Sequence, residues 1–227
     1  MTHNKFPDKS PAVIHTMFNM ISKEYDFLNN LMSFGMHNAV KLKCVQSLDI
    51  KPHANVIDLC CGTGDIARLV KKVQPNAIVT GIDFSENMLE IAKNKSEGIQ
   101  YFQGDVTNLP YPDETFDIVT MGFGLRNINN AEKAVEEVYR ILKPNGLFLH
   151  LDFGEKNILS HIFDMAVPIA IRLFTENTLS YKYLIDSKKA FPIPADLIKD
   201  FESKGFRLNK RLDFISGVIS AQIMEKI

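Results

Sequence analysis

The sequence predicts an α/β fold in which a mostly parallel sheet of seven strands carries helices on both faces. Short apolar runs rich in β-branched residues alternate with segments of helical pattern, which is typical of parallel strands joined by crossover helices. Two further apolar runs follow the last helical pattern with no helix between them, which is typical of a hairpin. Such sheets bind their ligands at the carboxyl ends of the strands, so candidate functional residues are expected there.

The alternating part of the chain supplies five strands and three helices. Strands are expected at residues 55–59, 77–82, 99–102, 116–121 and 147–153. Helices are expected between them at residues 65–73, 86–95 and 130–142. A last helix at 195–204, ended by Gly205, precedes the hairpin expected at 206–214 and 218–224.

Two helical regions flank this core. Before it, helical patterns at 10–23 and 38–48 stand on either side of a polar turn at 26–30, and residues 1–50 are expected to form a lid. After the fifth strand, an insertion at residues 155–192 is expected to line the substrate pocket. Its sequence holds a strongly apolar segment at 158–174, which is interrupted by Pro168, and a helical pattern at 180–190.

Composition fits one globular domain over residues 1–227 and excludes several classes of protein. The chain is 45% hydrophobic, and 26 Lys and Arg balance 27 Asp and Glu, so no bulk positive field exists to bind nucleic acid. The three cysteines do not have the spacing of a metal site. No signal peptide or run of about 18 apolar residues is present, and a cytoplasmic protein is expected.

A glycine loop follows the first strand. Asp58 lies in that strand, Gly62, Thr63 and Gly64 form the turn, and Asp65 begins the next helix. Glycine permits a positive φ and lets a ligand approach the backbone without a Cβ in the way. A simple strand-to-helix turn is the alternative, so the loop alone does not establish a ligand site.

Carboxylates follow the next two strands. Asp83 lies about 20 residues after the glycines, where a carboxylate can accept the hydroxyl protons of a ribose. It could instead cap the next helix beside Ser85. Asp105 is placed to accept a hydrogen bond from an exocyclic amine while Val106 packs on a base. Alternatively, Asp105 is an ordinary loop aspartate.

The charges around the glycine loop favour methyl transfer over hydride transfer. The glycines also fit the G-x-G-x-x-A pattern of dinucleotide enzymes, but a pyrophosphate at a helix N-terminus is not compatible with nearby anions. Asp58 and Asp65 flank these glycines. Two carboxylates suit a ligand with an amino group and a sulfonium, and S-adenosylmethionine carries both.

Over nearly its whole length the chain resembles the ubiquinone/menaquinone biosynthesis C-methyltransferases, which have a Rossmann-like class I methyltransferase fold. Four blocks carry the resemblance. Residues 23–37 are similar to the family's Y-D-x-M-N-x-x-M-S-x-G-x-H, 58–65 to D-L-A-G-G-T-G-D, 123–127 to F-G-L-R-N and 140–146 to R-V-L-K-P-G-G. The first and third blocks are together the most specific.

The resemblance implies S-adenosylmethionine as the cofactor, with contacts from Thr63, Asp83, Asp105 and Val106, and a polyprenyl quinol as the substrate. It also implies a substrate cavity near the residues Tyr25, Asp26, His37, Arg126 and Asn127. Because guanidinium stays protonated, Arg126 is expected to stabilise a phenolate or orient a water, while Asn127 holds a ring oxygen. A surface salt bridge is the alternative for Arg126.

The proton acceptor and the membrane contact stay open. Asp26 or His37 could accept the proton, but Asp26 could equally form a turn and His37 could begin a helix. The segment 158–174 either packs on the sheet or lines a groove for a polyprenyl tail, with peripheral attachment to a membrane.

Departures from the family pattern leave the acceptor less certain than the cofactor. Leu28 replaces methionine, Val40 replaces tryptophan, and Cys60 and Cys61 replace Ala-Gly; Gly122 replaces a serine, and Asp152 and Gly154 replace Glu and Ser. Two rival functions follow: a methyltransferase for another small acceptor, and a cofactor-binding protein without turnover.

Overall fold

The computed structural model describes residues 10–33, 35–172, 183 and 186–227 of the chain. Seven strands form one sheet in the order β3-β2-β1-β4-β5-β7-β6. They are β1 (Asn55–Leu59), β2 (Ile78–Asp83), β3 (Ile99–Gln103), β4 (Phe116–Gly122), β5 (Leu142–Phe153), β6 (Phe206–Phe214) and β7 (Ile219–Lys226). The first five pair in parallel, and β7 runs antiparallel to both β5 and β6. The predicted sheet, including its closing hairpin, is therefore confirmed.

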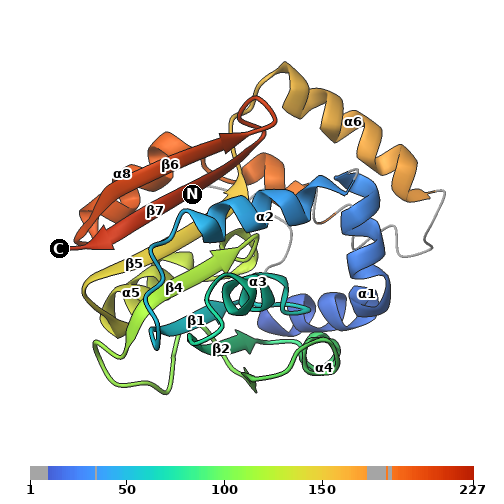
Figure 1. Cartoon of the computed structure of the whole chain (residues 1–227). Coiled ribbons are helices and arrows are strands. Elements are labelled where there is room, and N and C mark those ends of the chain that lie inside the picture. Colours follow the sequence, from blue (N-terminus) through green and yellow to red (C-terminus); the bar gives the residue numbers. More distant parts are fainter. Residues whose placement is uncertain (1–9, 34, 173–182, 184–185) are drawn as a thin grey trace.

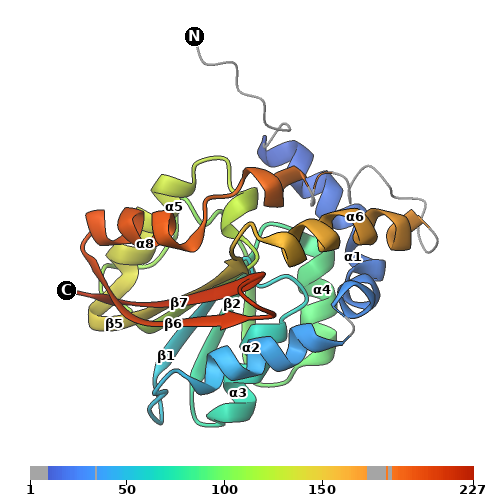
Figure 2. The ribbon, with the colours of Figure 1, turned by 90° about the horizontal axis from the view of Figure 1, so that it is seen from above.

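Helices cover both faces of this sheet, as predicted. Their bounds are α1 (Pro11–Met32), α2 (Met36–Gln46), α3 (Asp65–Val73), α4 (Glu86–Lys95), the 3-10 turn η1 (Leu125–Asn127), α5 (Ala131–Ile141), α6 (Ile158–Arg172) and α8 (Pro194–Ser203). Figure 2 shows α2 and α3 on one side of the sheet and α5 and α8 on the other. In Figure 1, α1 and α6 lie at the end toward which the arrows of β4 and β5 point. Within the described residues, no helix is long and apolar enough to span a membrane.

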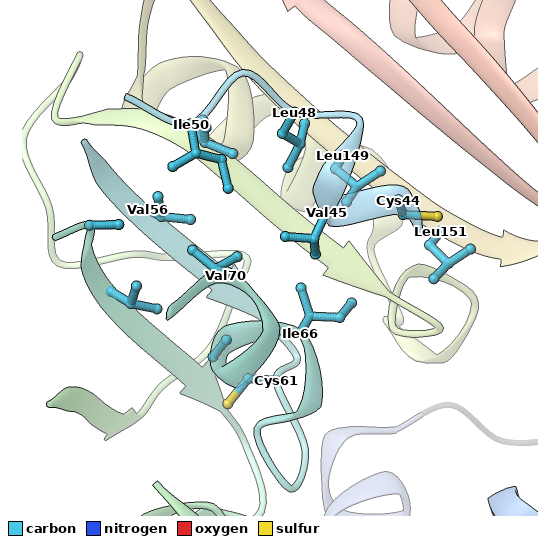
Figure 3. Close-up of a cluster of buried hydrophobic side chains, with 14 of the residues drawn as sticks. Cys44, Val45, Leu48, Ile50, Val56, Cys61, Ile66, Val70, Leu149 and Leu151 are labelled. Atoms are coloured by element: carbon cyan, nitrogen blue, oxygen red, sulfur yellow. The ribbon is translucent and has the colours of Figure 1, made fainter. Parts of the chain in front are cut away.

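Alternation along the central strands divides the core into two layers. Val56 of β1 packs with α2 and α3, whereas Ile57 and Leu59 of the same strand pack on the opposite face. Figure 3 shows the first layer, in which Val45 of α2 and Leu48 just after it lie over the sheet beside side chains of α3 and β5. Successive strand residues point to opposite faces, so an apolar run in a central strand serves both layers.

Aromatic rings dominate the second layer near the hairpin. Phe148 of β5 packs edge-on against Phe201 of α8 at 5.5 Å between ring centroids, and Phe201 packs in turn on Phe206 of β6. All three rings are less than 2% exposed. Burial of each such ring contributes about 1.5–3 kcal/mol, so these contacts fix the hairpin to the parallel strands.

One sequence expectation about the N-terminal region is wrong. The polar turn expected at residues 26–30 is helical, because α1 continues to Met32, and the chain instead turns at Gly35 with a φ of 74°. Turn formation by aspartate requires a hydrogen bond to its own nearby backbone. The carboxylate of Asp26 bonds instead to Thr63 and Lys95 in other elements, so α1 is not interrupted.

The apolar segment at 158–174 is helical in its described part, and α6 runs through position 168, so the interruption expected at Pro168 is wrong. Residues 186–190 are helical, as the pattern at 180–190 predicts. The rest of the pattern expected at 180–190, apart from Tyr183, lies outside the described residues.

A buried carboxylate joins three of these elements. Asp58 in β1 accepts a hydrogen bond from Thr120 Oγ1 of β4 at 2.7 Å and another from the backbone nitrogen of Ala67 in α3 at 3.2 Å. Its side chain is 1% exposed. Burial raises the pKa of Asp58 from its ordinary 3.8 to about 7, although both hydrogen bonds oppose this rise.

We expect Asp58 to make the protein less stable as the pH rises from about 4 to about 7. A carboxyl group with a raised pKa in the folded state binds its proton more tightly there than in the unfolded chain. The resulting stability is fully present below pH 4 and is lost as the pH passes the folded pKa, with an upper limit of about 4 kcal/mol. Urea unfolding of the wild type and of Asp58→Asn at several pH values measures it. A stability difference between the two proteins that does not change across this range would contradict the expectation.

Candidate functional site

A cavity of about 220 Å³ opens where the parallel strands end. Loops after β1 to β4 form its base, and α1 forms a wall. Its walls include Ile14, Phe18 and Tyr25 of α1, Cys60 and Gly62 after β1, Asp83 and Phe84 at the end of β2, Gly104 to Thr107 after β3, and Gly122 to Gly124 with Asn127 after β4. Strand order reverses between β1 and β4, and ligands of open α/β sheets bind at such a switch point.

Two residues other than glycine have a left-handed backbone at this switch point. Cys60 follows β1 with a φ of 53°, and Phe123 follows β4 with a φ of 57°. The left-handed region costs a residue other than glycine about 1–3 kcal/mol, and such strain gathers at functional sites. The two adjacent strands thus each end in a residue that turns the chain sharply beside the cavity.

The glycines of the first loop have different tasks. Gly62 has a φ of 54°, and a Cβ built on it would meet no atom within 4 Å, so its bare backbone faces open space at the cavity. Gly64 has a φ of 81°, and a Cβ there would come within 2.5 Å of Tyr101 Oη. Gly62 therefore permits ligand approach, whereas Gly64 permits close packing of the loop on β3.

Asp83 lines the cavity and holds the glycine loop. One oxygen accepts from the nitrogen of Gly62 at 2.7 Å, and the other accepts from the nitrogen of Ser85 at 2.9 Å. The helix cap is Ser85 itself, whose hydroxyl accepts from Met88, so the interpretation of Asp83 as the cap is wrong. Burial raises the pKa of Asp83, and its backbone hydrogen bonds oppose the rise. Each oxygen keeps a further lone pair that can accept a ligand hydroxyl.

Asp105 and Val106 line the cavity after β3. One oxygen of Asp105 accepts from both the nitrogen and the hydroxyl of Thr107, each at 2.8 Å. Val106 is buried and packs in the layer that contains Ile82 and Met121. The free oxygen of Asp105 and the apolar surface of Val106 are therefore both available to a flat polar ring.

Three predicted cofactor residues do not lie on the cavity wall. Asp58, Thr63 and Gly64 are not among the described residues that line the cavity. Thr63 is 2% exposed, and its hydroxyl donates to Asp26 Oδ1 at 2.7 Å. Asp26 is also paired with Lys95. This chain of contacts ties α1 to the glycine loop and to α4.

His37 lies in a polar cluster outside the cavity lining. Its Nδ1 is 3.3 Å from Lys41 Nζ, and its Nε2 is 2.9 Å from Asn30 Oδ1. Because an ammonium can only donate, this network assigns the proton of the neutral ring to Nε2. Burial, and then the charge of Lys41, lower the pKa of His37.

The same cluster changes the charge balance beside the glycines. Asp65 is bound by Lys41 at 2.7 Å and by Arg68 at 2.5 Å. Its negative charge is therefore compensated within the protein. Asp65 therefore no longer counts as an unpaired anion that disfavours a pyrophosphate at the glycine loop. The carboxylates of Asp83 and Asp105 at the cavity provide that argument instead.

Arg126 and Asn127 extend the site beyond β4. Arg126 is 5% exposed, and its Nη1 donates to Asp152 Oδ1 and to the carbonyl of Phe123, both at 2.7 Å. The interpretation of Arg126 as part of a surface salt bridge is therefore wrong, because its ion pair with Asp152 is buried. Asn127 lines the cavity and donates to the carbonyl of Phe123 at 3.1 Å.

Sequence reasoning missed several residues of this site, among them Ile14, Phe18 and Asp152. Ile14 and Phe18 lie one helical turn apart on α1 and could have been found from their spacing. Asp152 follows Arg126 by 26 positions, and no local pattern indicates that the two side chains meet.

The cavity fits a nucleoside with a cationic substituent. It combines a bare glycine backbone, two carboxylates that can accept from hydroxyl and amino groups, and apolar walls. Among the residues that the structure describes, no group of three or more His, Cys, Asp or Glu side chains could hold a metal ion.

Solved structures share this architecture. A SAM-dependent methyltransferase from Thermotoga maritima, described as a possible histamine N-methyltransferase, matches with a TM-score of 0.73 at 21% identity, over 94% of this chain and 100% of that one. The [4+2]-cyclase SpnF matches with a TM-score of 0.72 at 14% identity, over 97% of each chain. At these identities the likeness shows the fold alone.

Sequence relatives are more informative. Demethylmenaquinone methyltransferases of Staphylococcus aureus strains JH9 and Newman are each 38% identical to the chain over 218 residues, which cover 92% of this chain and 90% of theirs. The model of the ubiE/COQ5 methyltransferase family matches residues 5–226. Both the predicted fold and the predicted resemblance are confirmed, and the chain belongs to the ubiE/COQ5 methyltransferase family.

Proposed function

We propose that this methyltransferase uses S-adenosylmethionine to methylate a ring carbon of a polyprenylated quinol, converting demethylmenaquinol to menaquinol. The equivalent step in ubiquinone synthesis is the second candidate substrate. One observation carries the proposal: Asn127 lines a cavity whose walls suit a nucleoside, and the buried Arg126 immediately precedes Asn127 in the chain. The named relatives favour the menaquinone substrate.

Asp83, Asp105 and Val106 would hold the cofactor. The two oxygens of Asp83 would accept the ribose hydroxyls, and the free oxygen of Asp105 would accept from the adenine amine. Gly62 would let the ligand lie against the backbone. S-adenosylmethionine supplies a methyl group on a positively charged sulfur, which the nearby carboxylates favour electrostatically.

Arg126 and Asn127 would act on the acceptor ring. A neutral phenol is a weak carbon nucleophile, and its pKa near 10 leaves little phenolate at neutral pH. A guanidinium remains charged and can stabilise the negative ring oxygen as it develops. Asn127 would orient the same oxygen, so the adjacent ring carbon is directed at the methyl group.

Asp26 and His37 have a different role in this proposal. The side chains of both residues already have polar partners within the protein. Asp26 contacts Thr63 and Lys95, and His37 contacts Asn30 and Lys41. We assign them to holding α1 and α2 against the glycine loop. Helix α1 would then act as a lid, with Tyr25 on its inner wall.

The insertion after β5 would receive the substrate from a membrane. A second cavity of about 350 Å³ lies between Phe153, α6 and Phe191. The described part of α6 exposes four large apolar side chains: Ile158, Leu159, Ile162 and Met165. Lys156 and Lys189 at the second cavity are exposed and positively charged. An apolar helix face with cationic neighbours suits an anionic lipid surface.

Asp83→Ala should weaken S-adenosylmethionine binding by about 1.5–3 kcal/mol, the range for hydrogen bonds to a charged group. This corresponds to a rise in Kd of roughly 10- to 150-fold. Titration calorimetry measures it, with Asp213→Ala on the exposed part of β6 as the control. A folded Asp83→Ala variant with normal affinity would remove Asp83 from the cofactor site.

The wild type should transfer labelled methyl groups to demethylmenaquinol. The variant Arg126→Ala should lower kcat by about 10²- to 10³-fold, which is the cost of losing one preorganised group. The cofactor Kd should stay nearly constant, because the adenosine contacts lie elsewhere. Arg126→Lys should recover little activity if the shape of the guanidinium matters, and more if only its charge does. Full activity of the alanine variant would refute the role of Arg126, whereas an inactive wild type would refute the substrate.

The double variant Ile158→Glu/Ile162→Glu should bind anionic vesicles at least about tenfold more weakly than the wild type, because two apolar side chains can no longer enter the lipid. Ile227→Glu places a single carboxylate at an exposed apolar residue elsewhere and should bind normally. Sedimentation with phosphatidylglycerol vesicles measures both. Equal binding by all three proteins would exclude this face of α6 from membrane contact.

A further inference from the structure

We propose that Asp152 is a positioning residue for methyl transfer, which holds Arg126 by one end of its guanidinium and leaves the Nε–H free for a ring oxygen of the acceptor. The inference rests on the proposed function, because that function supplies the oxygen. It assigns a role to a residue outside the cavity wall and outside the motif that contains Arg126.

The carboxylate of Asp152 is fixed on one side. It lies near the end of β5 and is 0% exposed. Its Oδ1 accepts from Arg126 Nη1 at 2.7 Å and from the backbone nitrogen of Phe153 at 2.8 Å. The backbone bond orients the carboxylate, and the carboxylate in turn orients the guanidinium.

Two aromatic rings restrict the guanidinium further. Arg126 Cζ lies 5.6 Å from the ring centre of Phe123 and 5.1 Å from that of Phe153. These rings contact each other edge-on at 5.6 Å. Guanidinium groups are attracted to aromatic faces, so the two rings and Asp152 together limit the orientations of Arg126.

Polar atoms without partners remain around this pair. Within the described chain, Arg126 Nε, Asn127 Oδ1 and Asp152 Oδ2 are buried and have no hydrogen-bond partner. Leaving such atoms unsatisfied is costly, and here they comprise one donor and two acceptors on residues that contact one another or are adjacent in sequence. A hydroxyl group both accepts and donates a hydrogen bond, so a quinol hydroxyl complements this set.

The position of this pair fits such an acceptor. Phe123 and Asn127 line the first cavity, while Phe153 lines the second. Arg126 packs against both of these phenylalanines. The pair therefore lies between the space assigned to the cofactor and the space assigned to the incoming substrate.

A double-mutant cycle tests whether Asp152 acts through Arg126. In the wild-type background, Asp152→Asn should lower kcat on the order of 10²-fold, because a small displacement of a catalytic group has an effect of this size. The cofactor Kd should change less than about threefold. In the Arg126→Ala background the same substitution should cause no further loss of kcat, because the group that it positions is absent.

Glu137→Gln provides a matched control. Glu137 is also a buried carboxylate paired with an arginine, Arg140, at 2.8 Å, but it lies on α5 away from both cavities. This variant should lower the Tm and leave kcat per folded molecule unchanged. Asp152→Asn should lower both quantities.

Three outcomes would overturn the proposal: full kcat in Asp152→Asn, independent losses that multiply in the cycle, or a loss of Tm alone as in the control. If Asp152→Asn does not fold, Asp152→Ser keeps a hydrogen-bond acceptor on β5 but is too short to hold the guanidinium in place. It should then fold and show a reduced kcat, and full activity would reject the role. A wild type that does not methylate demethylmenaquinol rejects the proposed substrate and with it this inference, whereas an active wild type with a fully active Asp152→Asn rejects the inference alone.

Discussion

Asp58 connects the sheet to the glycine loop at the base of the cavity. It lies in β1 and accepts hydrogen bonds from Thr120 of the neighbouring strand β4 and from Ala67 in the first turn of α3. The glycine loop lies between these anchors, so its left-handed residues are held at both ends. A charged form of Asp58 would be poorly solvated there, which is why its two hydrogen bonds matter. The cavity can thus be strained locally because the layer beneath it is rigid.

Much of the fold follows from local sequence patterns. Alternating apolar runs and helical segments determine the strands of the parallel sheet, and Gly62 marks the loop that faces the cavity. Asp83 and Asp105 could be predicted because chain position after a strand specifies location at one edge of a parallel sheet. These predictions depend on contacts with neighbours in sequence or in the next strand.

The remaining features depend on partners distant in sequence. The helix through Asp26 persists because Thr63 and Lys95 bind its carboxylate. The burial of Arg126 depends on Asp152, which approaches only after β4 and β5 have paired. Periodicity carries no information on such encounters. A family resemblance can indicate that a residue matters, but the structure identifies the partner through which it acts.

Strand β7 comes last along the described chain, yet it inserts between β5 and β6 and pairs Ser220 with Asp152 and Ile219 with Phe153. During synthesis from the N-terminus, the edge of β5 therefore stays open until β7 has left the ribosome. An open edge strand is a template for association with other chains. Nascent chains that stall before β7 should consequently be recognised by chaperones that bind exposed strands, although the glycine loop and its strands are already complete.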